Sequence, residues 1–128
     1  MKNGEFIYAD THADFLNQAF GTNYKAWMKS AWFYDKDTFV WMVRFDHINR
    51  EGWRNVFETK ERIKEENLYE KKIWDGIPMS KLVNYKRIVI EVKDDIPKKY
   101  IFRGIYKYDE ENSDPYVVHY FDKIADEF

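Results

Sequence analysis

The residues best suited to bind a ligand lie in the polar stretch Asp46–Asn55, which contains His47, Trp53 and Asn55. An indole ring offers a face on which a nucleobase can stack, and an amide offers a donor and an acceptor to a base edge. We therefore predict that these three side chains form part of a base-sized pocket.

Two residues from the second half of the chain complete the predicted pocket. Arg103 and Tyr106 lie in an aromatic segment that we expect across the sheet from Trp53. Three lysines nearby (Lys98, Lys99 and Lys107) are placed to meet phosphates. The alternative is structural, because a tryptophan in a loop often packs against its own protein. In that interpretation Trp53 covers the open end of the sheet.

The sequence lacks the residue patterns that are typical of most catalytic and metal-binding sites. The three histidines (His12, His47 and His119) are dispersed, and no H-E-x-x-H motif is present. There is no cysteine, no G-x-S-x-G motif and no glycine-rich loop. We expect no metal site and no cofactor.

One acidic pattern leaves an enzyme open as an alternative. Metal-dependent nucleases place carboxylates and a lysine on strands, and Glu91-Val92-Lys93 has that character. The second acidic residue that such a site needs, on a neighbouring strand, cannot be identified. We therefore expect a protein without metal-dependent nuclease activity.

The first half of the chain predicts three strands and a helix. Glu5–Ala9 is a short strand, and the helix follows over Thr11–Phe20, capped by Asp10 or Thr11 and ended by Gly21. The segment Thr38–Asp46 is the strongest predicted strand, apolar on both faces and therefore central in a sheet. The aromatic run Lys25–Tyr34 before it is the third predicted strand, and the alternative for the stretch Thr22–Met28 is a helical turn capped by Thr22.

The middle of the chain is polar, and the end returns to strands. We expect Asp46–Asn55 to be a loop and Glu58–Asn67 to hold a short solvated helix capped by Thr59. A turn is predicted at Trp74–Pro78. Three later segments are predicted strands, the first two paired antiparallel and the third beside them: Arg87–Val92, Tyr100–Tyr108 and Pro115–Phe121.

These elements predict one α+β domain over residues 1–128, with a curved, mainly antiparallel sheet or partial barrel and one or two packing helices. The expected core draws on the helix and on the best strands. It comprises Phe15, Phe20, Trp41, Val43, Ile88, Ile90, Ile101 and Ile105.

Composition limits the class of partner. The 128 residues carry a net charge of −2, so contact with nucleic acid must be made by a local patch or by a pocket for one base. Aromatic residues make up 20% of the chain, more than a minimal core needs, so some rings are expected at the surface. The absence of cysteine, of a signal peptide and of a long apolar run fits a cytoplasmic protein that does not enter a membrane.

The second half of the chain, from Gly52 to Phe128, resembles the C-terminal part of PUA-like barrels, the group that holds the SRA, EVE and ASCH domains. The resemblance rests on the segment Tyr100–Tyr106 with its central glycine, on Asp109, and on the closing strand Val117–Ile124. It implies a small curved barrel whose pocket receives one nucleobase, often a modified one. Such modules occur alone or attached to restriction nucleases, and this chain is too short to add a nuclease domain. We expect a stand-alone reader or a fragment of a larger protein.

Three hypotheses follow from the sequence. The first is a non-enzymatic PUA-like module that binds a nucleic-acid base, including a modified base. The second is a small protein–protein interaction or inhibitor protein, of the kind that phages or mobile elements encode, which uses its exposed aromatic residues. The third is an enzyme that uses Glu91 and Lys93.

Overall fold

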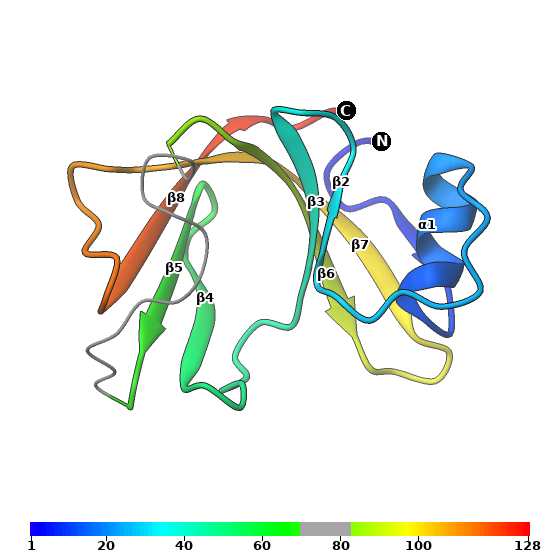
Figure 1. The fold of residues 1–128 in the computed structure, drawn as a ribbon, viewed down its shortest axis with the longest axis horizontal. Helices are drawn as coiled ribbons and strands as arrows, with labels where there is room; N and C mark the ends of the chain where they lie inside the picture. The colour runs from blue at the N-terminus through cyan, green and yellow to red at the C-terminus, as the bar shows by residue number, and fades with distance from the viewer. Residues whose placement is uncertain (70–82) are drawn as a thin grey trace.

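The protein is described by a computed structural model, which covers residues 1–69 and 83–128 (Figure 1). The predicted turn at Trp74–Pro78 lies outside the described residues. Within them the chain forms eight strands and one helix. In order these are β1 (Phe6–Tyr8), α1 (His12–Phe20), β2 (Ala31–Phe33), β3 (Thr38–Val43), β4 (Trp53–Thr59), β5 (Arg62–Asn67), β6 (Lys86–Lys93), β7 (Lys99–Tyr108) and β8 (Val118–Ala125).

The strands form one open, strongly curved sheet with the order β2-β3-β6-β7-β8-β5-β4, and β1 pairs with one end of β7. Figure 1 shows the sheet as an arch: β4, β5 and the start of β8 form one wing, and β2, β3 and β6 form the other. β3 and β6 pair in parallel, while the other described pairs are antiparallel. The predicted curved and mainly antiparallel sheet is confirmed, but the sheet is open and its closure into a barrel is not shown.

The helix α1 covers the convex face of the β3–β6–β7 part of the sheet (Figure 1). Its predicted ends are confirmed: Thr11 Oγ1 accepts a hydrogen bond from the Asp14 N–H at 3.1 Å, and Gly21 ends the helix with a φ of 70°. Phe15 on the buried face stacks on Tyr100 of β7, with ring centroids 4.9 Å apart. This contact fixes the helix on the sheet.

The core is divided in two by the sheet, as the alternation of side chains along a strand requires. All six residues of β3 are buried, which confirms its predicted central position. The convex core beneath α1 and the concave core inside the arch take alternate residues of β3 and β6. The convex core includes Val40, Met42, Ile88, Ile90 and Phe102, and the concave core includes Phe39, Trp41, Ile63, Val89, Tyr106 and Phe121.

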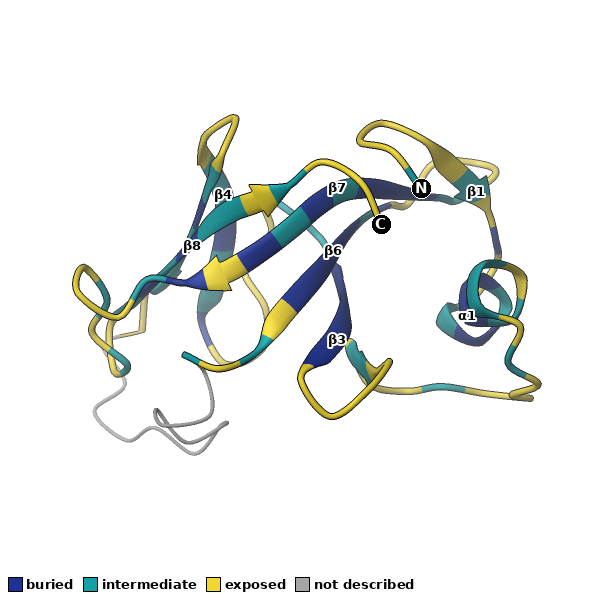
Figure 2. Cartoon of the chain, turned by 90° about the horizontal axis from the view of Figure 1, so that it is seen from above, coloured by how far each residue is buried: buried dark blue, intermediate teal, exposed yellow. Residues whose placement is uncertain are grey.

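Burial follows the prediction with two exceptions. Six of the eight expected core residues are buried, whereas Phe20 and Ile105 are only partly buried and pack at the rim of the convex core. In Figure 2 the buried residues are concentrated in β3, β6 and β7, while most turns and loops are exposed.

The segment from Trp53 to Asn67 differs most from the prediction. It is a β-hairpin, not a loop followed by a short helix, because β4 and β5 pair antiparallel from Trp53↔Asn67 onward. Thr59 does not cap a helix; its hydroxyl accepts the Glu61 N–H at 3.2 Å in the hairpin turn. The charged side chains of β5 suggested a solvated helix, but three of the four (Arg62, Lys64 and Glu66) lie on the strand face opposite the buried Ile63, where charge is tolerated.

The C-terminal strands are confirmed with small shifts. β6 and β7 pair antiparallel from Lys86↔Lys107 to Lys93↔Lys99, and β8 lies beside β7. β8 begins at Val118, later than predicted, because Val117 and Val118 both donate hydrogen bonds to the Asp114 carbonyl in a turn. No helix in the described part of the chain is long and apolar enough to cross a membrane.

Candidate functional site

A cavity of about 260 Å³ lies between β3, the loop after it, β4 and β5. Two indole rings line it, Trp41 from β3 and Trp53 from β4. The polar lining includes Asn55 and Glu65 deep in the arch and the exposed His47 at the rim. We call this space the indole cavity.

The strand β4 places Trp53 and Asn55 on the same face, because residues two apart on a strand point the same way. The preceding loop is held by its own hydrogen bonds: Asn49 Oδ1 accepts the Trp53 N–H at 3.0 Å, and the Asp46 N–H donates to the Asn55 carbonyl at 2.8 Å. Gly52, with a φ of 89°, is required here, since a Cβ at this position would lie 2.5 Å from Tyr69 Cγ.

Behind Trp53, a buried histidine of β8 contacts polar groups of the same wing. The Trp53 ring stacks on His119 of β8, with centroids 4.8 Å apart and planes 22° from parallel. His119 is 1% exposed, and its ring nitrogens lie 2.8 Å from Glu65 Oε1 and 3.0 Å from the Pro115 carbonyl oxygen. Both partners are oxygen atoms, one of a carboxylate and one of a backbone carbonyl.

The Glu65 carboxylate is held in its ionised form. Burial raises the pKa of Glu65, but the hydrogen bond and charge of His119, the charge of Arg87 and a hydrogen bond from Asn55 outweigh burial and lower it. Glu65 therefore faces the indole cavity as an acceptor at neutral pH.

Arg87 supports the site from beneath. This buried guanidinium lies over three aromatic rings, with its Cζ 4.9 Å from the centroid of Trp41, 4.8 Å from Phe39 and 4.1 Å from Phe121. Burial lowers the pKa of Arg87 to about 10, and the negative charge of Glu65 opposes this shift, so the group remains a cation at neutral pH. Cation–π contacts of this kind are worth about 2 kcal/mol or more when desolvated.

The clearest sign of a ligand is the side chain of Asn55. It is 7% exposed, and its Oδ1 has no hydrogen-bond partner among the described residues, although the side chain also bonds to Glu65. A buried acceptor left without a partner costs about 1–3 kcal/mol. A ligand that brings a donor into the indole cavity would remove this cost.

The predicted site residues fall into two groups. His47, Trp53 and Asn55 line the indole cavity together. Arg103 and Tyr106 do not join them; they line a second cavity beside the tip of the β4–β5 hairpin. The prediction of one pocket built from all five residues is therefore wrong in its geometry, because Phe57 and the hairpin tip belong to the second cavity only.

Trp41 and Glu65 are among the residues of the indole cavity that sequence reasoning missed. Trp41 was expected only in the core, and Glu65 was placed on a solvated helix. The alternation of Trp53, Asn55 and Phe57 is the period-2 signal that could have identified β4. Once β4 is identified as a strand, the same period-2 alternation on its partner β5 places Ile63 and Glu65 on one face.

The residues of the nuclease alternative are not arranged as a metal site. Glu91 Oε1 pairs with Arg103 at 2.8 Å, and within residues 1–69 and 83–128 no three His, Cys, Asp or Glu side chains converge as metal ligands.

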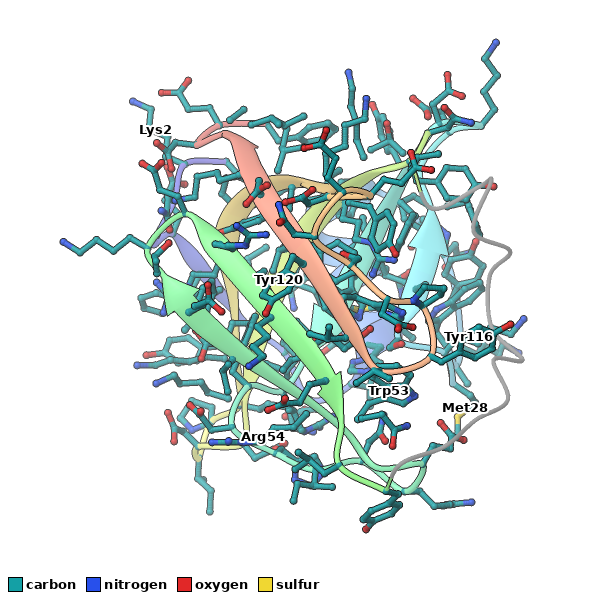
Figure 3. All side chains as sticks on the ribbon, turned by 90° about the vertical axis from the view of Figure 1, so that its left-hand side faces the viewer. Lys2, Met28, Trp53, Arg54, Tyr116 and Tyr120 are labelled. Carbon is teal, nitrogen blue, oxygen red and sulfur yellow. The ribbon has the colours of Figure 1, made fainter. Side chains whose placement is uncertain are left out.

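Figure 3 looks onto the outer surface of the wing formed by β4, β5 and β8. Trp53 is labelled at one end of this wing, near the start of β8, and Arg54 and Tyr120 are labelled further along it. Arg54 pairs with Asp46 at 3.4 Å, and the Arg62 guanidinium covers the Tyr120 ring at 4.2 Å. Of the residues that line the indole cavity, Figure 3 labels Trp53, which lies at the end of the wing where the loop before β4 joins it.

Comparisons with known proteins agree on the fold. The family model "SRA: SET and RING associated domain" matches residues 2–128, so the match includes the N-terminal half as well as the segment in which the sequence shows a resemblance. Among solved structures, the 5-hydroxymethylcytosine-specific restriction enzyme AbaSI is similar, with a TM-score of 0.63 and 23% identity. The similar region covers 96% of this chain and 39% of that chain, so this chain spans well under half the length of AbaSI. A search of the curated proteins found no match.

Proposed function

The chain belongs to the SRA family, and we propose that it binds DNA and reads a modified cytosine, which is extruded from the duplex into the indole cavity. The family membership supports a DNA ligand. The specificity stated in the name of AbaSI, for 5-hydroxymethylcytosine, supports a cytosine with a substituent at carbon 5.

The observation that carries this proposal is the unpartnered Asn55 Oδ1 beside the ionised Glu65. Both groups are acceptors, so they favour a base that presents hydrogen-bond donors. The exocyclic amino group of cytosine is such a donor, and a hydroxymethyl substituent adds another. The two indoles contribute the apolar, aromatic walls that a flat ring needs.

The free-energy cost of extruding a base from the duplex must be offset by the interactions that the base makes in the cavity. Taking one base out of the stack costs a few kcal/mol, and stacking on an aromatic side chain returns about 1–3 kcal/mol per base. Hydrogen bonds to Asn55 and Glu65 supply the remainder and the discrimination between bases. Loss of these two groups should therefore reduce specificity as well as affinity.

The charge of the chain limits how it can hold DNA. With a net charge of −2 it has no overall attraction for the duplex backbone, so few phosphates should be neutralised on binding. We expect the affinity to depend mainly on the base in the cavity and only weakly on salt.

The test is fluorescence anisotropy with duplexes of one sequence that carry cytosine, 5-methylcytosine or 5-hydroxymethylcytosine at a single position. We expect tighter binding of a modified duplex, and a loss of that preference in Asn55→Ala. Gln18→Ala, in α1 on the convex face, is the matched control and should bind as the wild type does. Equal binding of all three duplexes, or none at low salt, would refute the proposal.

The protein–protein interaction hypothesis gains nothing from the comparisons, which point to a DNA-binding family.

A further inference from the structure

A second and larger cavity, of about 750 Å³, opens between the β4–β5 hairpin tip, β6, β7 and β8. We call it the hairpin cavity. Its lining includes Phe57, Glu91, Arg103, Tyr106 and Lys123. Its volume lies within the range of small-molecule sites. The indole cavity and the proposed base reading do not use it.

A bulge in β7 creates the arrangement of this site. Arg103 and Tyr106 are three residues apart and would point to opposite faces of a regular strand. The register of β7 shifts against both neighbours around Gly104, which has a φ of 124°. The bulge therefore turns both side chains into one cavity, a known use of bulges at functional sites.

Gly104 also provides the space. A Cβ there would lie 2.9 Å from the Ala125 carbonyl oxygen and 3.2 Å from Lys123 Cε, so any larger residue would push β8 away. The close approach brings Lys123 beside the Tyr106 ring, with its Nζ 5.9 Å from the ring centroid. The bulge and the glycine together bring the side chains of Arg103, Tyr106 and Lys123 to one side of the hairpin cavity.

The hydroxyl of Tyr106 is the feature that points to a ligand. The residue is fully buried, and its hydroxyl has no hydrogen-bond partner among the described residues. Burial raises the pKa of Tyr106 to about 12, so the hydroxyl keeps its proton at neutral pH and can donate it. A phenylalanine would fill the same space without an unpaired polar group, which indicates that the hydroxyl has a partner when a ligand is bound.

The charges of the cavity favour an uncharged group over an isolated anion. Arg103 pairs with Glu91 at 2.8 Å, and Lys123 pairs with Asp126 at 3.0 Å. Lys60 and Glu61 at the hairpin tip add one charge of each sign. The cavity thus offers both hydrogen-bond donors and acceptors, while its positive and negative charges largely cancel.

An aromatic face completes the lining. Phe57 stacks on Phe45 on one side, with centroids 4.1 Å apart, and also lines the hairpin cavity. An aromatic surface beside paired donors and acceptors matches a nucleobase, which has a flat ring and an edge with both kinds of group.

We propose that the hairpin cavity is a second nucleobase site, in which the Tyr106 hydroxyl donates a hydrogen bond to the base. The base comes either from the DNA that occupies the indole cavity or from a free mononucleotide. Only the first source rests on the proposed function. Phe57 lies four residues beyond Trp53 on β4, about 13 Å along the strand, so one DNA strand a few nucleotides long could reach both cavities.

The experiment measures binding by wild type, Tyr106→Phe and Asn55→Ala to two kinds of ligand. One is the modified-cytosine duplex, and the other is each of the four deoxynucleoside monophosphates, titrated calorimetrically. Tyr106→Phe removes only an unpartnered hydroxyl, so its melting temperature should be unchanged or higher. Its binding should be weaker by about three- to tenfold, the effect of one hydrogen bond. Tyr100→Phe, on the same strand and the other face, is the control: it loses a contact to His12 at 2.7 Å but should bind normally.

The outcomes separate the two proposals. Weaker duplex binding by Tyr106→Phe supports a base from the DNA, and weaker mononucleotide binding alone supports a free nucleotide. If the duplex does not bind but mononucleotide binding depends on Tyr106, the proposed function fails and the second site stands. If duplex binding depends on Asn55 while Tyr106→Phe equals wild type with every ligand, the second site is refuted and the proposed function stands. If no ligand binds to the wild type, both are refuted.

Discussion

Replacing Trp53 by alanine separates a ligand-binding tryptophan from one that only covers the arch. In the structure Trp53 does both: its ring stacks on the buried His119, and its side chain lines the indole cavity. The substitution therefore has two measurable consequences, one for stability and one for binding.

The expected sizes follow from burial and stacking. Truncating a fully buried tryptophan costs about 3–5 kcal/mol, and Trp53 is only partly buried, so we expect roughly half of that, about 2 kcal/mol, for the free energy of unfolding. Losing one base–aromatic stack costs about 1–3 kcal/mol, which corresponds to an affinity weaker by about 5- to 150-fold.

Urea denaturation and fluorescence anisotropy, on the same protein preparations, measure the two quantities. Trp53→Phe is the matched variant, because it keeps an aromatic ring for His119 and for a base, and it should recover most of the affinity. Binding must be measured where Trp53→Ala is fully folded. If the loss of affinity then disappears, or if Trp53→Phe binds as poorly as the alanine variant, the stacking role of Trp53 is wrong.

Three further predictions concern the core, pH and catalysis. Trp41→Ala should lower the free energy of unfolding by about 3–5 kcal/mol, since Trp41 is 6% exposed, and a variant that unfolds at the wild-type temperature would contradict its central position. The pKa of Glu65 is lower in the folded protein than in the unfolded chain, so its contribution to stability is present above the unfolded value of about 4.5 and is lost as the pH falls from there through the folded pKa. Denaturation between pH 7 and pH 3 should show this loss in wild type and a smaller one in Glu65→Gln, and parallel curves would exclude the effect. Incubation with DNA or RNA and Mg²⁺ or Mn²⁺ should yield no cleavage, and cutting that vanishes in Lys93→Ala would overturn this expectation.

The helix α1 and the strand β3 could be predicted from the sequence because local sequence signals and tertiary packing favour the same structure in both. Thr11 and Gly21 mark the ends of α1 by cap chemistry that needs no tertiary partner. The run from Thr38 to Val43 is apolar on both faces, and only a strand covered on both sides accommodates that pattern.

The wing of β4 and β5 could not be read in the same way. β5 carries Arg62, Lys64, Glu65 and Glu66, and only Ile63 is a strong apolar signal. Its strand form comes from pairing with β4 on one side and β8 on the other, which are long-range contacts that no local window contains. Glu65 was not predicted as a site residue for the same reason. Its side chain faces the indole cavity only because β5 is paired with β4 and β8.

The division between the two cavities was also hidden from the sequence. Arg103 and Tyr106 were expected beside Trp53, and a regular β7 would have offered only one of them to the inside of the arch. The bulge at Gly104 brings both inside, but at the hairpin end rather than the loop end. A glycine within a strand pattern indicates a bulge, but it does not indicate which neighbouring strand the bulged strand will approach closely.

The most direct measurement is a crystal structure of the protein with a short duplex that carries one 5-hydroxymethylcytosine. We predict that the modified base lies outside the duplex, between Trp41 and Trp53, with its amino or hydroxymethyl group within hydrogen-bonding distance of Asn55 Oδ1 or the Glu65 carboxylate. A modified base that remains stacked in the duplex, or an indole cavity that stays empty while DNA is bound elsewhere, would contradict it.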